Sequence, residues 1–268
     1  MPFSTDVHDP PPQFPPPPPF QLVVPERKPI GVGKAILIFA AYLVSQAVAG
    51  GVAMVGYSVL SGNDALLSAS LNDMDPVLFL VAGFAGFVLG GPVIVALARA
   101  MEGGATWRQA LAPLGMVKAP AKATLAGAGV GVAIALVLGF GLERVLPSPE
   151  NAQGPLIEAA SAPGWQRILF VLLAVVLAPV FEEFLFRGVL YTGMLRSWGK
   201  WPAGIVVTLM FGLLHVFDVA GYWPALGMIT VVGLALLIAR IKTKSLIPAM
   251  AMHATYNLVQ VVGLYLTI

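Results

Sequence analysis

Long apolar stretches separated by short polar segments make up most of the chain after residue 34. A helix needs about 20 mostly apolar residues to cross the hydrocarbon core of a bilayer. Stretches that approach this length predict seven transmembrane helices, near Ala35–Leu60, Pro76–Ala98, Thr124–Gly141, Ile168–Leu195, Ala203–Phe217, Trp223–Ala239 and Leu246–Ile268. The predicted fold is therefore an all-α, polytopic transmembrane bundle of about seven spans, with a range of about six to eight.

Basic residues occur in every second segment between these predicted helices. They lie before the first helix (Arg27, Lys28, Lys34) and after the second (Arg99, Arg108, Lys118, Lys122), the fourth (Arg196, Lys200) and the sixth (Arg240, Lys242, Lys244). Because Lys and Arg concentrate on the cytoplasmic side of a membrane, this alternation predicts a cytoplasmic N-terminus and a C-terminus at the opposite face.

Composition supports a membrane protein and narrows its chemistry. Hydrophobic residues make up 58% of the chain and charged residues 10%, and the mean hydropathy is +0.86. The net charge of +2 is spread over the cytoplasmic segments, so we expect no nucleic-acid partner. The absence of cysteine excludes disulfides and thiolate chemistry. We expect an integral protein of the bacterial inner membrane, because the chain shows no organelle signal.

Three regions follow from these patterns. Residues 1–30 contain the proline runs Pro10–Pro12 and Pro15–Pro19 and are predicted to be a disordered cytoplasmic arm, interpreted as a solvated tail without a known partner. Residues 31–147 are predicted to be scaffold helices. They carry two GxxxG spacings, Gly86 to Gly90 and Gly127 to Gly131, which favour close packing within the chain. Residues 148–268 are predicted to be the catalytic core.

Three ionisable residues interrupt the fourth apolar stretch: Glu182, Glu183 and Arg187. Charges inside a bilayer cost several kcal/mol, so such residues usually serve a function. Glu183 and Arg187 are four residues apart and share a helix face, which predicts a structural ion pair. Glu182 points to a different side of the helix and has no partner there. The pattern therefore leaves Glu182 available as a general base.

The two histidines outside the arm also lie in predicted helices. His215 follows Phe211 by one helical turn, and His253 precedes Asn257 by one turn. Each pair alone also fits a structural role between helices. Taken together with Glu182, they predict one polar pocket within the membrane. There, a carboxylate and an imidazole would activate a water, and a second imidazole with a carboxamide would bind an oxyanion, which is the chemistry of amide hydrolysis.

The order of these residues resembles a known family. Three short motifs follow one another on the predicted helices: EExxxR (Glu182, Glu183, Arg187), FxxxH (Phe211, His215) and HxxxN (His253, Asn257). Between about Ile168 and Asn257, the chain is therefore similar to the CPBP family, the CAAX proteases and bacteriocin-processing (Abi) intramembrane proteases. That family includes the type II CAAX prenyl endopeptidases, which remove the last three residues from prenylated proteins.

The resemblance implies roles for the motif residues. Glu182 with His215 would activate the water, and His253 with Asn257 would bind the oxyanion. Glu183 would be mainly structural, together with the arginine of the first motif, and could share the catalytic role. The implied activity is that of an intramembrane endopeptidase of the glutamic type, acting on a membrane-associated peptide or protein, including a lipidated one.

Several alternatives remain open at this point. Zinc could be bound by Glu182, His215 and His253. We favour a mechanism without metal, because no HExxH motif is present and Asn257 would then lack a role. A non-catalytic membrane scaffold or bacteriocin-immunity protein is the main competing function. A transporter is disfavoured, because no charge pair recurs in the two halves of the chain.

Overall fold

The computed structural model describes residues 29–62, 75–142, 144–146, 158, 160–161, 164–216, 219 and 222–267. Residues 1–28 of the predicted arm lie outside this part of the chain. The described ranges contain helices and no strand. The predicted all-α helical membrane bundle is thus confirmed, and the chain is an integral membrane protein.

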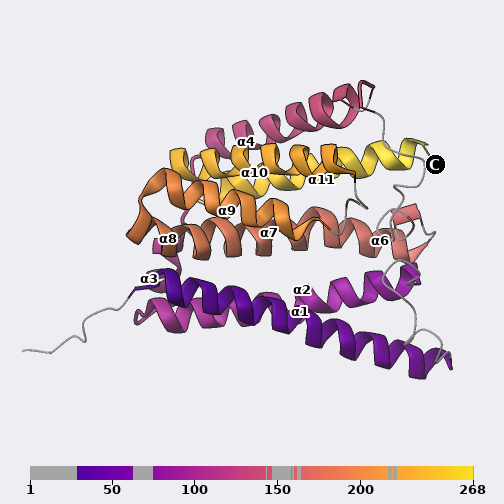
Figure 1. Ribbon diagram of the computed structural model, residues 1–268, viewed down its shortest axis with the longest axis horizontal. Helices are drawn as coiled ribbons and strands as arrows, with labels where there is room; N and C mark the ends of the chain where they lie inside the picture. Colours follow the sequence, from indigo (N-terminus) through magenta and orange to yellow (C-terminus); the bar gives the residue numbers. More distant parts are fainter. Residues whose placement is uncertain are drawn as a thin grey trace, which may run out of the picture.

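The first helices form the two outer layers of the bundle (Figure 1). Helix α1 (Val32–Ser61) packs along α2 (Pro76–Glu102), and together they cover one side. Short helices α3 (Trp107–Leu111) and η3 (Ala112–Leu114) follow α2. Helix α4 (Ala121–Ile134) continues into the π-helical segment η4 (Ala135–Leu142) and lies on the opposite side, against α11.

The remaining helices lie between these layers (Figure 1). The fourth predicted span is one long helix that changes geometry several times along its length. It consists of α6 (Trp165–Val171), π-helical η5 (Leu172–Leu177), α7 (Ala178–Glu183), π-helical η6 (Phe184–Leu190) and α8 (Tyr191–Trp198). The last three helices are α9 (Lys200–Leu214), α10 (Trp223–Thr243) and α11 (Ile247–Thr267).

Five helices in the described residues are long and apolar enough to cross a membrane. They are Val32–Ser61, Pro76–Glu102, Ala121–Gly139, Trp165–Trp198 and Trp223–Thr243, and they match the first four and the sixth of the predicted spans. The fifth predicted span is the shorter apolar helix α9. The seventh is α11, in which polar residues such as His253, Asn257 and Gln260 lower the hydropathy. The count of seven spans stays a prediction.

Both predicted GxxxG pairs are close contacts within the chain. On α2, a Cβ at Gly90 would lie 2.6 Å from Ser45 Oγ of α1, and Gln46 Nε2 donates to Gly86 O at 2.8 Å. On α4, a Cβ at Gly131 would lie only 2.2 Å from the Met252 carbonyl oxygen of α11. Since side chains would not fit there, the glycines let the helix backbones approach. The second contact supports the helix that carries His253 and Asn257.

Candidate active site

The glutamate pair ends α7, between the two π-helical segments η5 and η6. Pro179 in the first turn of α7 cannot donate a backbone hydrogen bond, which favours an irregular helix at this point. Wide π-helical turns inside an α-helix often occur at functional sites. The irregular helix geometry and the charged residues therefore both indicate that this segment contains the functional site.

Glu183 and Arg187 form the ion pair predicted from their spacing. Arg187 Nη1 donates to Glu183 Oε1 at 2.9 Å, and both side chains are fully buried. Arg187 Nη2 donates to the carbonyl oxygen of Gly233 on α10, also at 2.9 Å. A Cβ at Gly233 would lie 3.2 Å from Nη2, so the glycine leaves room for the guanidinium. The pair thereby joins the fourth span to α10.

His253 lies between the two glutamates. Its Nδ1 is 3.1 Å from Glu183 Oε1, and its Nε2 is 3.9 Å from Glu182 Oε2. A carboxylate oxygen accepts hydrogen bonds, so Nδ1 carries the proton that it shares with Glu183. The longer distance exceeds that of a direct hydrogen bond. The outer nitrogen of His253 therefore faces the glutamate predicted to be the base.

The Glu182 carboxylate is enclosed without being neutralised by a direct bond. Its side chain is 16% exposed, and its Oε2 is buried with no hydrogen-bond partner in the described part of the chain. The carboxylate interacts electrostatically with the rings of both His215 and His253. Buried polar atoms are almost always hydrogen-bonded, so an unpartnered carboxylate oxygen calls for a functional explanation.

Phe211 connects the aromatic and charged groups of the site. Its ring centroid is 4.8 Å from that of His215 and 5.9 Å from that of His253, and Arg187 Cζ lies 4.3 Å from it. His215 directly follows the last residue of α9 and caps that helix, and its Nδ1 lies 2.9 Å from the Phe211 carbonyl oxygen. Since that oxygen accepts, Nδ1 carries the proton and a neutral ring keeps Nε2 as an acceptor.

Asn257 reaches the fourth span from α11. Its Nδ2 donates to the carbonyl oxygen of Ala174 on η5 at 2.7 Å. One amide hydrogen is used in that bond, while a carboxamide nitrogen has two to donate. The side chain is thus held in place one helical turn from His253. Its role in binding an oxyanion stays a prediction.

The described residues contain no group of three or more His, Asp and Glu side chains arranged to hold a metal ion. Glu182, His215 and His253, the alternative zinc ligands, do not form such a set here. Nδ1 of His253 faces Glu183 and Nδ1 of His215 faces the Phe211 carbonyl oxygen, contacts that would equally orient Nε2 of each ring toward a metal ion. A mechanism without metal therefore stays a prediction, and no step of the chemistry below uses a metal ion.

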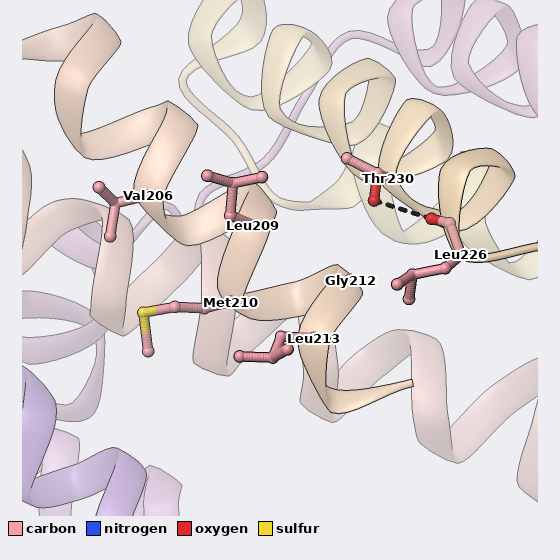
Figure 2. Close-up of a pocket in the computed structure, with 7 residues that line it drawn as sticks. All are labelled: Val206, Leu209, Met210, Gly212, Leu213, Leu226 and Thr230. Atoms are coloured by element: carbon pink, nitrogen blue, oxygen red, sulfur yellow. Dashed lines mark hydrogen bonds between the residues drawn. The ribbon is translucent and has the colours of Figure 1, made fainter. Parts of the chain in front are cut away.

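An apolar groove of about 360 Å³ lies between residues of α9 and α10 (Figure 2). Its lining residues are Val206, Leu209, Met210, Gly212, Leu213, Leu226 and Thr230. The Thr230 hydroxyl donates to the Leu226 carbonyl oxygen within its own helix, as Figure 2 shows. None of the lining residues can exchange a proton near neutral pH. The groove therefore supplies apolar surface and no catalytic group.

Sequence reasoning missed the main-chain partners of the site. The carbonyl groups of Gly233 and Ala174 bind Arg187 and Asn257, respectively. A main-chain oxygen is present at every residue, so no sequence signal points to these two. Gly233 is only a weak signal for the contact with Arg187, because many glycines in membrane helices mark a close approach between helices.

Residues 163–259 match the family described as type II CAAX prenyl endopeptidase Rce1-like. Searches of curated proteins and of solved structures gave no significant match. The matched segment contains all three motifs and the helices from α6 to most of α11. The resemblance predicted from the motifs is confirmed: residues 163–259 of this membrane protein are similar to the Rce1-like type II CAAX prenyl endopeptidases of the CPBP family.

Proposed function

We propose that this protein is a glutamate-dependent intramembrane endopeptidase that cleaves a peptide bond of a membrane-associated, lipidated substrate. The observation that carries the proposal is the Glu182 carboxylate. It is enclosed and has an oxygen without a hydrogen-bond partner among the described residues, 3.9 Å from His253 Nε2. This carboxylate lies in a segment that matches a family of endopeptidases.

In the proposed reaction, Glu182 and His215 hold a water molecule. Glu182 accepts a proton from the water as its oxygen forms a bond to the carbonyl carbon of the substrate. His253 and Asn257 donate hydrogen bonds to the resulting oxyanion. When the C–N bond breaks, the proton on Glu182 passes to the departing amine. The products are a carboxylic acid and an amine, and Glu182 is again a carboxylate.

The Glu183 carboxylate supports this division of roles. To donate from Nε2, His253 must be protonated on both nitrogens, because Nδ1–H already faces Glu183. The Glu183 carboxylate oxygen lies 3.1 Å from Nδ1 and holds the ring so that Nε2 faces Glu182. Arg187 in turn holds Glu183 in place at 2.9 Å. Glu183 and Arg187 thus act by orienting His253, not by touching the substrate.

The test uses purified protein in lipid nanodiscs and an internally quenched peptide with a farnesylated CaaX end. We expect cleavage by wild type and by the exposed control Glu158→Gln, and none by Glu182→Gln. The same peptide without farnesyl tests whether lipidation is required. Cleavage by Glu182→Gln would refute the mechanism, and no cleavage of either peptide by wild type would refute the proposed substrate class.

The natural substrate can be sought independently of that peptide. We propose that the protein works in a bacterial inner membrane, with the proline-rich arm on the cytoplasmic side. Comparative proteomics of membrane peptides from wild-type and Glu182→Gln cells should reveal a product that is lost only in the variant. If His215→Ala and Glu182→Ala cells keep full biological function at normal protein levels, the non-catalytic scaffold is the better explanation.

A further inference from the structure

Helix α1 runs antiparallel to the fourth span, and contacts at two levels define the register. A Cβ at Gly193 would lie 2.7 Å from the Cβ of Ala35. One turn further along α1, the rings of Phe39 and Phe186 meet edge to face with centroids 6.1 Å apart. The four residues from Ala35 to Phe39 on α1 therefore span the same distance as the seven residues from Gly193 back to Phe186 on the fourth span. By the same ratio, residues 42 and 43 of α1 lie at the level of about residues 179 to 181, in the turn that ends with the glutamate pair.

Helix α2 gives an independent check of this register. A Cβ at Gly90 would lie 2.6 Å from Ser45 Oγ of α1, and one at Gly91 would lie 2.4 Å from the ring of Phe181. Neighbouring residues of α2 thus contact Ser45 and Phe181, which puts these two at a similar depth. The residue on the buried face of α1 between Phe39 and Ser45 is therefore level with the glutamate pair.

That residue is Tyr42. It follows Ala35 and Ile38 on the buried face of α1 and is 7% exposed. It belongs to the same buried cluster as Phe184 and Leu185, which directly follow the two glutamates. Its hydroxyl is close enough to Glu182 for an electrostatic interaction with the carboxylate. A tyrosine buried in this way usually directs its hydroxyl to a hydrogen-bond partner.

We propose that Tyr42 is a positioning residue of the hydrolytic site, whose hydroxyl donates a hydrogen bond to the Glu182 carboxylate when substrate is bound and holds it toward the reacting water. The inference rests on the proposed function. Catalytic hydrogen bonds are often long in the free enzyme and shorten in the complex, which fits two groups that lie at a similar depth and are not hydrogen-bonded to each other here. Tyr42 lies outside the matched segment, so the scaffold half contributes to the site.

The same helix offers a matched control. Tyr57 is half-buried on α1, 15 residues after Tyr42, so it is about 22 Å further along the helix. Tyr42→Phe and Tyr57→Phe each remove one hydroxyl and keep the ring that packs. Both are compared with wild type and Glu182→Gln in nanodiscs, using the farnesylated quenched peptide and measuring kcat, KM and Tm.

We expect Tyr42→Phe to lower kcat by about 10- to 100-fold with KM and Tm unchanged, because the hydroxyl orients the base that accepts the proton of the water and does not contact the substrate. Tyr57→Phe should behave as wild type. Equal kcat in the two tyrosine variants, with Glu182→Gln inactive, overturns this inference and leaves the proposed function intact. The inference is also overturned if Tyr42→Phe loses activity and its Tm falls as well, because the tyrosine would then be a structural residue. An active Glu182→Gln variant, or an inactive wild type, overturns both.

Discussion

Nδ1 of His253 lies 3.1 Å from Oε1 of Glu183, the same oxygen that accepts from Arg187. The spacing of residues within one helix predicts only the contact with Arg187. The contact with His253 joins the fourth span to α11 and turns the opposite edge of the imidazole toward Glu182. Glu183 is therefore both the counter-ion of a buried arginine and the group that orients a histidine of the candidate site.

The buried ion pair should contribute strongly to stability. Glu183→Ala leaves Arg187 buried without its partner, and we expect the free energy of unfolding to fall by about 3–5 kcal/mol. Arg187→Ala should cost a similar amount. The double variant should cost clearly less than the sum, because each single change already breaks the pair. Unfolding in detergent, followed by circular dichroism, measures all three, and the exposed Arg108→Ala is the control. Additive losses would contradict a coupled pair.

Asn257 should affect the rate far more than the stability. Asn257→Ala removes one hydrogen bond to the Ala174 carbonyl oxygen, which is worth about 1 kcal/mol in the free energy of unfolding. If the carboxamide also binds the oxyanion, we expect kcat to fall by about 10²- to 10³-fold. Gln260→Ala, three residues later on the same helix, is the control. A kcat within twofold of wild type would leave Asn257 as a purely structural contact.

The glycines of α4 should differ according to what each one faces. A Cβ at Gly131 would meet the Met252 carbonyl oxygen at 2.2 Å, whereas nothing lies within 4 Å of a Cβ at Gly129. We expect Gly131→Ala to lower the free energy of unfolding by about 1–3 kcal/mol, as overpacking does. It should also lower activity, because α11 carries His253. Gly129→Ala should be neutral or slightly stabilising. Equal effects of the two substitutions on Tm would refute the close contact of α4 with α11.

The reaction should not depend on a bound metal. We expect purified protein to contain zinc well below one equivalent, and its cleavage of the farnesylated peptide to be unchanged after treatment with 1,10-phenanthroline. Elemental analysis and the rate before and after chelation check this directly. A non-chelating phenanthroline isomer controls for effects on the membrane. Stoichiometric zinc whose removal abolishes activity and whose return restores it would reverse our preference.

The transmembrane helices and the polar residues on them follow from the sequence alone. Apolar stretches of sufficient length must pair their backbone groups internally in lipid, which makes helices the expected structure. The Glu183–Arg187 pair and both GxxxG contacts also depend on local spacing, and the structure contains them. The exception is the π-helical geometry of the fourth span. Two π-helical segments flank Glu182 and Glu183, and no periodicity of apolar residues signals them.

The contacts between side chains of different helices depended on the tertiary structure. The sequence by itself determined that this is a helical membrane protein and which polar side chains lie on its helices, because length, hydropathy and intrahelical spacing are local properties. Only the fold decided that His253 contacts Glu183, that Asn257 is held by Ala174, and that Tyr42 lies level with Glu182. These relations depend on how the helices are placed around one another. That placement is set by close packing at residues such as Gly233 and Gly131, summed over many weak contacts.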